Sequence, residues 1–321
     1  MKRKALPSDP ALSARLAGLL YSVEQLDGIS RRRFRGKWIF RKPDGTPITK
    51  TEEVHRINDL VIPPAWTNVW IAPNPCCHLQ AVGYDARGRK QYRYHSAFRA
   101  LRDSTKFERV LQFAAALPVL RKQVLENLQI HGLTKEKVLA ALVRILDITA
   151  IRVGNVQYAK TNNSFGLTTL TRDHVSVSKE KITFHFNGKS GVEHCLNLQD
   201  KRLARVVQDC QEIPGQELFQ FFDEAGVPHK IRSEDLNEYI QTASGRQFTA
   251  KDFRTWNGSR AAMVLLSQHE APKSQTEGKA VILATIKAVA AHLNNRPATC
   301  RKYLSLIHIS EPTRLRRISY A

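Results

Sequence analysis

Four side chains, far apart in the sequence, have the types that chemistry on a phosphate ester requires. Arg152 and Arg254 carry planar, permanently charged guanidinium groups, which can hold phosphate oxygens with paired hydrogen bonds. Lys189 lies in the loop NGKSG, is charged at neutral pH, and can give a proton to a leaving oxygen. Asn295 can donate one more hydrogen bond. Each of them alone also fits a solvated or helix-capping role, so only the set predicts a phosphoryl-transfer site.

The charge of the chain points to a polyanionic partner. Its 321 residues contain 50 Lys plus Arg against 29 Asp plus Glu, a formal net charge of +21. Such an excess favours nucleic acid ahead of ribosomes or acidic membrane surfaces. No apolar run of about 18 residues is present and the N-terminus has no apolar signal core, so we expect a cytoplasmic protein without a membrane partner. Five scattered cysteines without a CxxC pair predict reduced thiols and no metal site.

Short strands and turns dominate the first hundred residues. The run 37–42, followed by Asp44 and Gly45, predicts a hairpin, and a second pair of strands at 79–84 and 90–94 flanks a turn. From Phe98 the apolar residues recur at helical spacing. We therefore expect a β-rich DNA-binding domain over residues 1–97, followed by a second domain.

Helices dominate the second domain, which we place at 98–304. Alternating apolar residues predict a small antiparallel sheet, with the Lys189 loop between its second and third strands. The expected helices lie at 136–150, 199–212, 234–244, 249–267 and 277–293, and the expected strands at 175–177, 182–186 and 192–198. The fold class is therefore α+β, with a β-rich N-terminal domain and a mostly helical catalytic domain.

Several ordered stretches of this sequence match one protein family. They are QYRYH at 91–95, IRVGN at 151–155, SFGLTT at 164–169, FHFNGKSG at 184–191, KDFRTW at 251–256 and LNNRPATCRK at 293–302. Together they resemble the small type IB DNA topoisomerases of bacteria and poxviruses over about residues 25–303. Several long motifs in a fixed order are far more specific than a lone short pattern.

The resemblance implies a fold and a mechanism. It implies a monomeric two-domain clamp around duplex DNA at the bacterial nucleoid, whose helical domain shares the fold of tyrosine recombinases. A tyrosine would attack a DNA phosphodiester, form a 3′-phosphotyrosyl link and later release the resealed strand, without metal, ATP or another cofactor. Carried over to this sequence, Arg152, Arg254 and Asn295 would stabilise charge on the phosphate oxygens, and Lys189 would protonate the 5′ oxygen.

The resemblance also implies DNA contacts in the N-terminal domain. Gln91, Tyr92 and Tyr94 match a family motif that contacts base edges in the major groove. Strand alternation predicts Tyr92 and Tyr94 on one face and Gln91 on the other, and two half-buried strand aromatics are the alternative interpretation. In the basic run RRRFRGK we expect Arg33 and Arg35 to contact phosphates, although such a run is also typical of a solvated face.

The chain departs from the family at the nucleophile. Counted from Asn295, the position of the attacking tyrosine falls on Leu304, which cannot form a phosphotyrosine. Tyr303 is one residue early, which on a helix is a rotation of about 100°. The stretch 305–321 does not resemble the family and is similar to translated sequencing adapter, so an assembly artefact is one hypothesis for its origin.

Three functions are compatible with the sequence. The first is a topoisomerase that relaxes supercoiled DNA. The second is a tyrosine recombinase, but recombinases usually have histidine three residues before the second arginine, where this chain has Lys251, a further expected DNA contact. The third is a DNA-binding clamp without catalysis, because position 304 is leucine.

Overall fold

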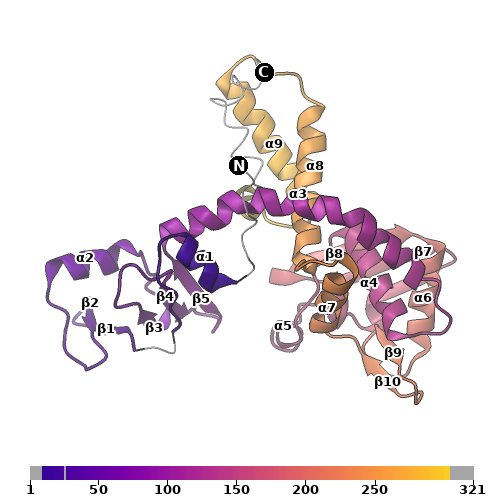
Figure 1. Ribbon diagram of the computed structural model, residues 1–321, viewed down its shortest axis with the longest axis horizontal. Helices are drawn as coiled ribbons and strands as arrows, with labels where there is room; N and C mark the ends of the chain where they lie inside the picture. Colours follow the sequence, from indigo (N-terminus) through magenta and orange to yellow (C-terminus); the bar gives the residue numbers. More distant parts are fainter. Residues whose placement is uncertain (1–8, 25–26, 304–321) are drawn as a thin grey trace. The chain divides into compact units, whose positions relative to one another are not determined.

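The chain divides into two compact units. The computed structural model describes residues 9–24 and 27–303, and its units are Met1–Glu108 and Arg109–Ala321. The division falls inside the long helix α3, Ser96–Asn127 (Figure 1). This helix begins beside Phe98, where the sequence changes from strand to helical spacing.

Unit 1 is built around a five-stranded antiparallel sheet with the strand order β2-β1-β3-β4-β5. Helix α2 contributes Ile57 to the cluster of buried side chains that includes Ile29 and Phe40 of the sheet. Such a shared apolar cluster is what stabilises a small sheet in water. The elements are α1 (Pro10–Leu16), β1 (Ile29–Phe34), β2 (Lys37–Arg41), α2 (Thr51–Asp59), β3 (Thr67–Ile71), β4 (Leu79–Tyr84) and β5 (Lys90–Tyr94).

The sequence predicted that β2 would form a hairpin with the segment after it, and this prediction is wrong. Strand β2 pairs with the preceding β1 across Arg35 and Gly36, whose φ angles of 47° and 79° suit a tight two-residue turn. The turn at Asp44 and Gly45 does form, but it leads only to an isolated bridge between Arg41 and Pro47. Beside this bridge the N–H of Ile48 donates to the Phe40 carbonyl oxygen at 2.9 Å, and helix α2 begins at Thr51, so the paired segment stays short. The second expected hairpin, β4 with β5, is confirmed.

Unit 2 surrounds one large apolar core. The three-stranded antiparallel sheet β6-β7-β8 lies beside α6 (Figure 1), and α4 contributes many of the buried side chains of the core. The principal elements are α4 (Lys135–Thr149), α5 (Val156–Asn162), β6 (Val175–Ser178), β7 (Lys181–Asn187), β8 (Glu193–Gln199), α6 (Lys201–Glu212), β9 (Gln220–Phe222), β10 (Pro228–Lys230), α7 (Ser233–Ser244), α8 (Ala250–Ser267), α9 (Gln275–His292) and α10 (Pro297–Tyr303).

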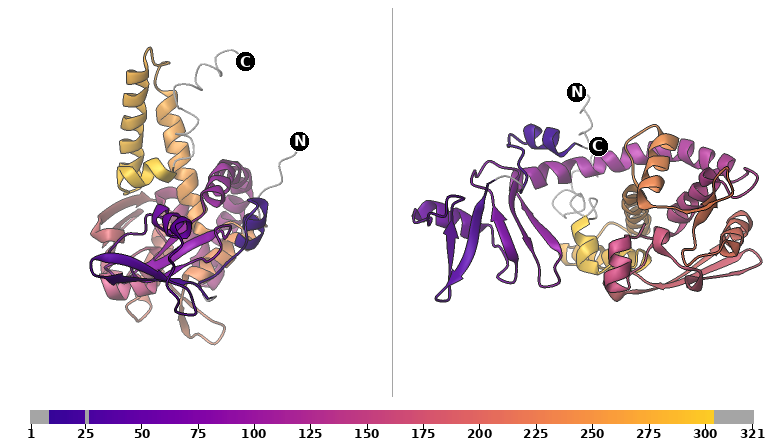
Figure 2. Two further views of the ribbon diagram at one scale, coloured as in Figure 1. Left: turned by 90° about the vertical axis from the view of Figure 1, so that its left-hand side faces the viewer. Right: turned by 90° about the horizontal axis from the view of Figure 1, so that it is seen from below.

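The five helices and three strands expected in unit 2 are confirmed. Their observed ends differ from the expected ends by two residues or fewer. The sequence did not predict the short hairpin β9-β10 or the helix α5. Helices α8 and α9 pack side by side and extend away from the three-stranded sheet (Figures 1 and 2). Within residues 9–24 and 27–303, no helix is long and apolar enough to cross a membrane.

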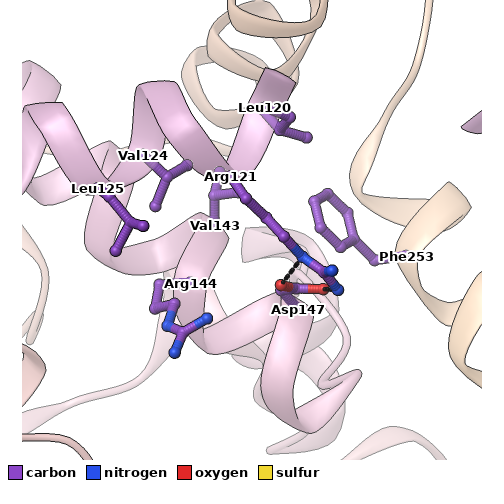
Figure 3. Close-up of a pocket in the computed structure, with 8 residues that line it drawn as sticks. All are labelled: Leu120, Arg121, Val124, Leu125, Val143, Arg144, Asp147 and Phe253. Carbon is purple, nitrogen blue, oxygen red and sulfur yellow. Dashed lines mark hydrogen bonds and ion pairs between the residues drawn. The ribbon is translucent and has the colours of Figure 1, made fainter. Parts of the chain in front are cut away.

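A small pocket lies where α3, α4 and α8 meet (Figure 3). Two of its polar side chains bind each other, because Arg121 donates two hydrogen bonds, of 2.8 and 3.0 Å, to the carboxylate of Asp147. The amide of Asn257 on α8 donates to the Asp147 carbonyl oxygen at 3.2 Å. These bonds tie α8 to the last turn of α4. The pocket is therefore a structural junction, and it helps to fix the helix that carries Arg254.

Candidate active site

The last turn of α4 places Arg152. The helix ends at Ala150, which has left-handed φ and ψ angles of 51° and 27° and donates its N–H to the Leu146 carbonyl oxygen at 2.9 Å. Chain direction changes at this cap, and Arg152 follows two residues later. The N–H of Leu167 then donates to the Arg152 carbonyl oxygen at 2.8 Å, which holds the arginine backbone against the next segment.

Two glycines allow this close approach. Gly154 has a φ of +100°, a value that side-chain-bearing residues rarely adopt. A Cβ atom on Gly166 would lie 2.4 Å from the Gly154 nitrogen and 2.6 Å from the Arg152 carbonyl oxygen. Backbone atoms cannot give way as a flexible side chain can. The glycines of the stretches IRVGN at 151–155 and SFGLTT at 164–169 therefore have a steric cause, since the two backbones touch at these positions.

The end of α9 places Asn295. Asn294 has a φ of 46°, and its N–H donates to the Ala291 carbonyl oxygen at 3.0 Å. The N–H of Asn295 donates to the Ala290 carbonyl oxygen at 2.8 Å, which completes a Schellman cap. The sequence suggested Asn295 as an alternative helix cap, but Asn294 is the left-handed residue. The side chain of Asn295 is thus free for another role.

The structure brings Arg152, Arg254 and Asn295 together. Both guanidinium groups donate to the Oδ1 atom of Asn295, Arg152 through a short contact and Arg254 at 3.3 Å. Arg254 also donates to the backbone carbonyl oxygens of Ala150 and, at 2.9 Å, of Leu293. Because Oδ1 accepts from two cations, the amide nitrogen of Asn295 must face away from them and remains a donor. The expected grouping of these three residues is therefore present.

No carboxylate of the described residues contributes to the electrostatics of Arg152 and Arg254. Burial, and then the charge of Arg152, lowers the pKa of Arg254 to about 10, and burial also lowers the pKa of Arg152. The Nη1 atom of Arg152 is buried and has no hydrogen-bond partner among the described residues. Two partly buried cations with an unused donor form a site for an anion with several oxygens.

Cys300, on α10, completes the surroundings of the arginine pair. Its side chain is 2% exposed, and burial raises the pKa of its thiol. A hydrogen bond from Asn295 and the charges of Arg254 and Arg152 act in the opposite direction. The sequence predicts Cys300 only as a reduced thiol. The sequence signal that could have placed Cys300 at the site is its position. It lies five residues after Asn295 and one turn into a helix that begins with Pro297.

Lys189 lies at the tip of the β7-β8 hairpin, as expected. Its side chain is exposed, and the structure shows no contact between it and the arginine pair. The hairpin is nevertheless tied to the segment that holds Arg152, because the N–H of Phe165 donates to the Asn187 carbonyl oxygen at 2.8 Å. The N–H of Gly188 donates to the Val192 carbonyl oxygen and closes the base of the loop. The base of the hairpin is therefore held close to the site, while the Lys189 side chain at its tip stays exposed.

His194, on β8, was not identified from the sequence. Its side chain is 3% exposed and stacks on Phe186, with a ring-centroid distance of 4.9 Å. Burial, and then the charges of Arg152 and Arg254, lowers the pKa of His194 to about 4. The imidazole is therefore neutral at physiological pH, and its location beside two cations explains why it must be.

The nucleophile position can be followed only in part. Tyr303 is the last residue of α10, and its side chain is not among those described. Leu304 and the stretch 305–321 lie outside the described residues. Lys251, the remaining predicted residue of unit 2, is exposed on the first turn of α8.

The predicted residues of unit 1 lie on two different surfaces. Tyr92 and Tyr94 are 44% and 36% exposed, and their rings stack at 6.0 Å, so they share one face as the alternation predicted. Gln91 faces elsewhere and donates to Asp85 at 3.0 Å. Arg33 and Arg35 are exposed on the β1-β2 hairpin. These positions leave the tyrosine rings and both guanidinium groups accessible to a partner.

Two family descriptions match the chain. The family described as "Eukaryotic DNA topoisomerase I, catalytic core" matches residues 95–310, and the one described as "Bacterial DNA topoisomerase IB, N-terminal domain" matches residues 37–85. The first match covers more than half of the chain and includes Arg152, Lys189, Arg254 and Asn295. The second lies within the sheet of unit 1.

Individual proteins show the same relation. The "DNA topoisomerase 1B" of Acanthamoeba polyphaga mimivirus is 32% identical over 284 residues, which are 86% of this chain and 84% of the viral protein. The "DNA topoisomerase 1B" of vaccinia virus (strain Copenhagen) is 24% identical over 231 residues, 69% of this chain and 68% of its own. Among solved structures, a XerH site-specific recombinase bound to palindromic difH covers 57% of this chain and 46% of its own at 14% identity. Its TM-score of 0.35 is too low to support an inference.

Proposed function

Because the chain belongs to the type IB DNA topoisomerases, we propose that it acts on duplex DNA by cutting one strand through a 3′-phosphotyrosyl link and resealing it. The swivelling of the cut strand would relax supercoils, and the energy of the broken bond would be kept in the phosphotyrosine. The observation that carries the proposal is the convergence of Arg152, Arg254 and Asn295, with one buried guanidinium nitrogen that has no partner among the described residues.

The roles of the three converging residues follow from the charge of the transition state. Attack on a phosphodiester gives a five-coordinate phosphorus whose non-bridging oxygens carry extra negative charge. Arg152 and Arg254 would bind those oxygens, and the amide nitrogen of Asn295 would donate a further hydrogen bond. Removing one such preorganised donor typically raises a barrier by about 2.7–4 kcal/mol. The donors are preorganised here because the Oδ1 atom of Asn295 holds both guanidinium groups, and two backbone carbonyl oxygens also hold that of Arg254.

Lys189 supplies the remaining chemistry in this proposal. The leaving group is the 5′ oxygen of a deoxyribose, which leaves poorly unless it is protonated as the bond breaks. Lys189 is exposed on a hairpin tip, and its ammonium group would give this proton to the leaving oxygen when DNA is bound. In unit 1, Gln91, Tyr92 and Tyr94 would read base edges, while Arg33, Arg35 and, on unit 2, Lys251 would contact phosphates.

A second candidate function has its own observation. The position of the attacking tyrosine falls on Leu304, so the chain as written can be a clamp that binds DNA without cutting it. Tyr303 could replace the nucleophile only if the backbone shifted, since adjacent helix residues point about 100° apart. A recombinase is less favoured, because Lys251 stands where recombinases usually have histidine.

Relaxation of supercoiled plasmid in EDTA tests the proposed function. We compare the chain with its Leu304→Tyr and Tyr303→Phe variants, and expect Leu304→Tyr to create or raise relaxation, because it restores a hydroxyl at the expected position. Tyr303→Phe should then have no effect. A gel shift without relaxation by any variant would support the clamp. If Leu304→Tyr stays inactive while Tyr303→Phe abolishes relaxation, Tyr303 is the nucleophile.

A further inference from the structure

His194 occupies an enclosed position between the two parts of the candidate site. One face of its ring stacks on Phe186, with an angle of 12° between the ring planes. Its Nε2 atom is covered by Gly188, where a Cβ atom would lie only 2.4 Å away. The opposite nitrogen, Nδ1, is 3.2 Å from the amide nitrogen of Asn294. The hairpin of Lys189 and the turn of Asn295 therefore both rest on this one ring.

The contact with Asn294 defines the tautomer. An amide nitrogen can only donate, so Nδ1 of His194 must accept, and the ring proton must be on Nε2. That Nε2–H group is buried and has no partner among the described residues. An unsatisfied buried donor reduces stability, because it loses its hydrogen bond to water and gains none in the protein. Packing alone does not explain an imidazole at this position, because phenylalanine would pack there without leaving a buried donor unsatisfied.

Asn294 connects the ring to the site. It is the left-handed residue of the Schellman cap that sets the direction of Asn295. Gly188 connects the ring to the other side, because it immediately precedes Lys189 and closes the hairpin base through Val192. A shift of the ring would thus change the separation between the hairpin and the cap.

We propose that His194 is a positioning residue, which holds the Asn294 side chain and supports Gly188 so that the Lys189 hairpin keeps a fixed place beside the turn of Asn295. This inference rests on the proposed function, since Lys189 and Asn295 have their roles only if they act on a phosphodiester. His194 itself touches neither DNA nor the leaving oxygen in this mechanism.

The variant Asn294→Gly isolates the contact. Glycine accepts a positive φ without strain, so the cap is kept while the amide donor is lost. Asn294→Ala, in contrast, disturbs both. The matched control is Asn68→Gly, because Asn68 is an exposed asparagine of unit 1 with almost the same φ, 47°. His194→Phe keeps the ring stacking and removes the acceptor, although its larger ring lies against Gly188.

The first measurement does not depend on activity. In the chain as written, nitrogen NMR of the histidine rings should show His194 as the neutral Nε2–H tautomer. The signal of His194 is the one that disappears in His194→Phe. Amide hydrogen exchange at Phe186 and Gly188 should become about 10-fold faster in Asn294→Gly and unchanged in Asn68→Gly. An Nδ1–H tautomer, or equal exchange in Asn294→Gly and the parent chain, would overturn the proposal.

The second measurement separates positioning of Lys189 from general damage. In the Leu304→Tyr background, Asn294→Gly should slow single-turnover cleavage of an ordinary DNA strand by about 10-fold. A strand with sulfur in place of the 5′ bridging oxygen needs no proton donor, because a thiolate leaves readily, and it should be cleaved at nearly the unaltered rate. Equal slowing of both strands contradicts the inference. If neither the parent chain nor Leu304→Tyr cleaves either strand, the proposed function fails, while NMR and exchange still decide the role of His194.

Discussion

At the scale of single residues, the site is defined by what its arginines lack. Arg109 and Arg121 of the same unit each pair with a carboxylate, that of Asp252 at 2.6 Å and that of Asp147 at 2.8 Å. Arg152 and Arg254 instead share the neutral oxygen of Asn295. A neutral acceptor orients both cations without cancelling their charge, which leaves their electrostatic attraction available to a phosphate.

Arg254 should be intolerant of lysine. Its planar fork donates at once to Ala150, Leu293 and Asn295, whereas a single ammonium group cannot satisfy this geometry. In the Leu304→Tyr background we expect Arg254→Lys to slow single-turnover cleavage by about 100-fold or more. The control is Arg260→Lys on the same helix, where the arginine is exposed. Cleavage within a few-fold of the parent would show that Arg254 is a structural residue only.

His194 should make the stability of unit 2 sensitive to acid. Its pKa in the folded chain is about 4, against about 6.5 in an unfolded one, so the unfolded chain binds the proton first as the pH falls. The contribution is complete above about pH 6.5 and is lost progressively between there and pH 4, by about 3 kcal/mol. Urea unfolding at a series of pH values measures this loss. Between pH 6.5 and pH 4 the free energy of unfolding should change less steeply with pH in His194→Phe than in the parent chain. The same dependence on pH in both would contradict the lowered pKa of His194.

At the scale of elements, much of the architecture could be predicted because the helices of unit 2 have strong periodicity and clear ends. The β7-β8 hairpin and the ends of α4 and α9 were expected from alternation and helical spacing, and these are the elements that carry Lys189, Arg152 and Asn295. Two features could not be predicted. The β1-β2 pairing depends on a turn of Arg35 with Gly36, which carries a weaker signal than Asp44 with Gly45. The role of His194 depends on contacts between distant segments, which local patterns do not contain.

Gly166 should be irreplaceable by alanine. Its Cβ atom would meet three backbone atoms within 2.6 Å, in Gly154 and Arg152, so the two segments would have to separate. Overpacking of this kind typically costs about 1–3 kcal/mol, and we expect Gly166→Ala to lower the free energy of unfolding by at least that amount. Cleavage in the Leu304→Tyr background should fall as well, because the Arg152 backbone is displaced. Ser164→Ala, in the same segment, is the control, and equal stability of the two variants would refute the steric argument.

At the scale of the whole molecule, the net charge of +21 favours DNA without showing where DNA binds. Neighbouring arginines in unit 1 differ sharply in this respect. Arg31 is committed to the fold, since its guanidinium donates to the carbonyl oxygens of Ile62, Pro63 and Trp66 and lies 4.0 Å from the Trp38 ring centroid. Arg33 and Arg35 are exposed. The same run of basic residues thus contains a structural member and candidate phosphate contacts.

This difference predicts how salt affects DNA binding. Each phosphate that a cation neutralises contributes about 0.9 to the slope of log affinity against log salt concentration on duplex DNA, because counterions are released. The double variant Arg33→Gln, Arg35→Gln should therefore reduce the slope by up to about 2 and weaken binding similarly on all sequences. Arg31→Gln is the matched control, and it should lower the stability of unit 1 and leave the slope unchanged wherever the protein remains folded. Titration of a short duplex at several salt concentrations measures both slopes. An unchanged slope in the double variant would place the DNA contacts of unit 1 away from the β1-β2 hairpin, because counterion release depends on the phosphates contacted and not on the total charge.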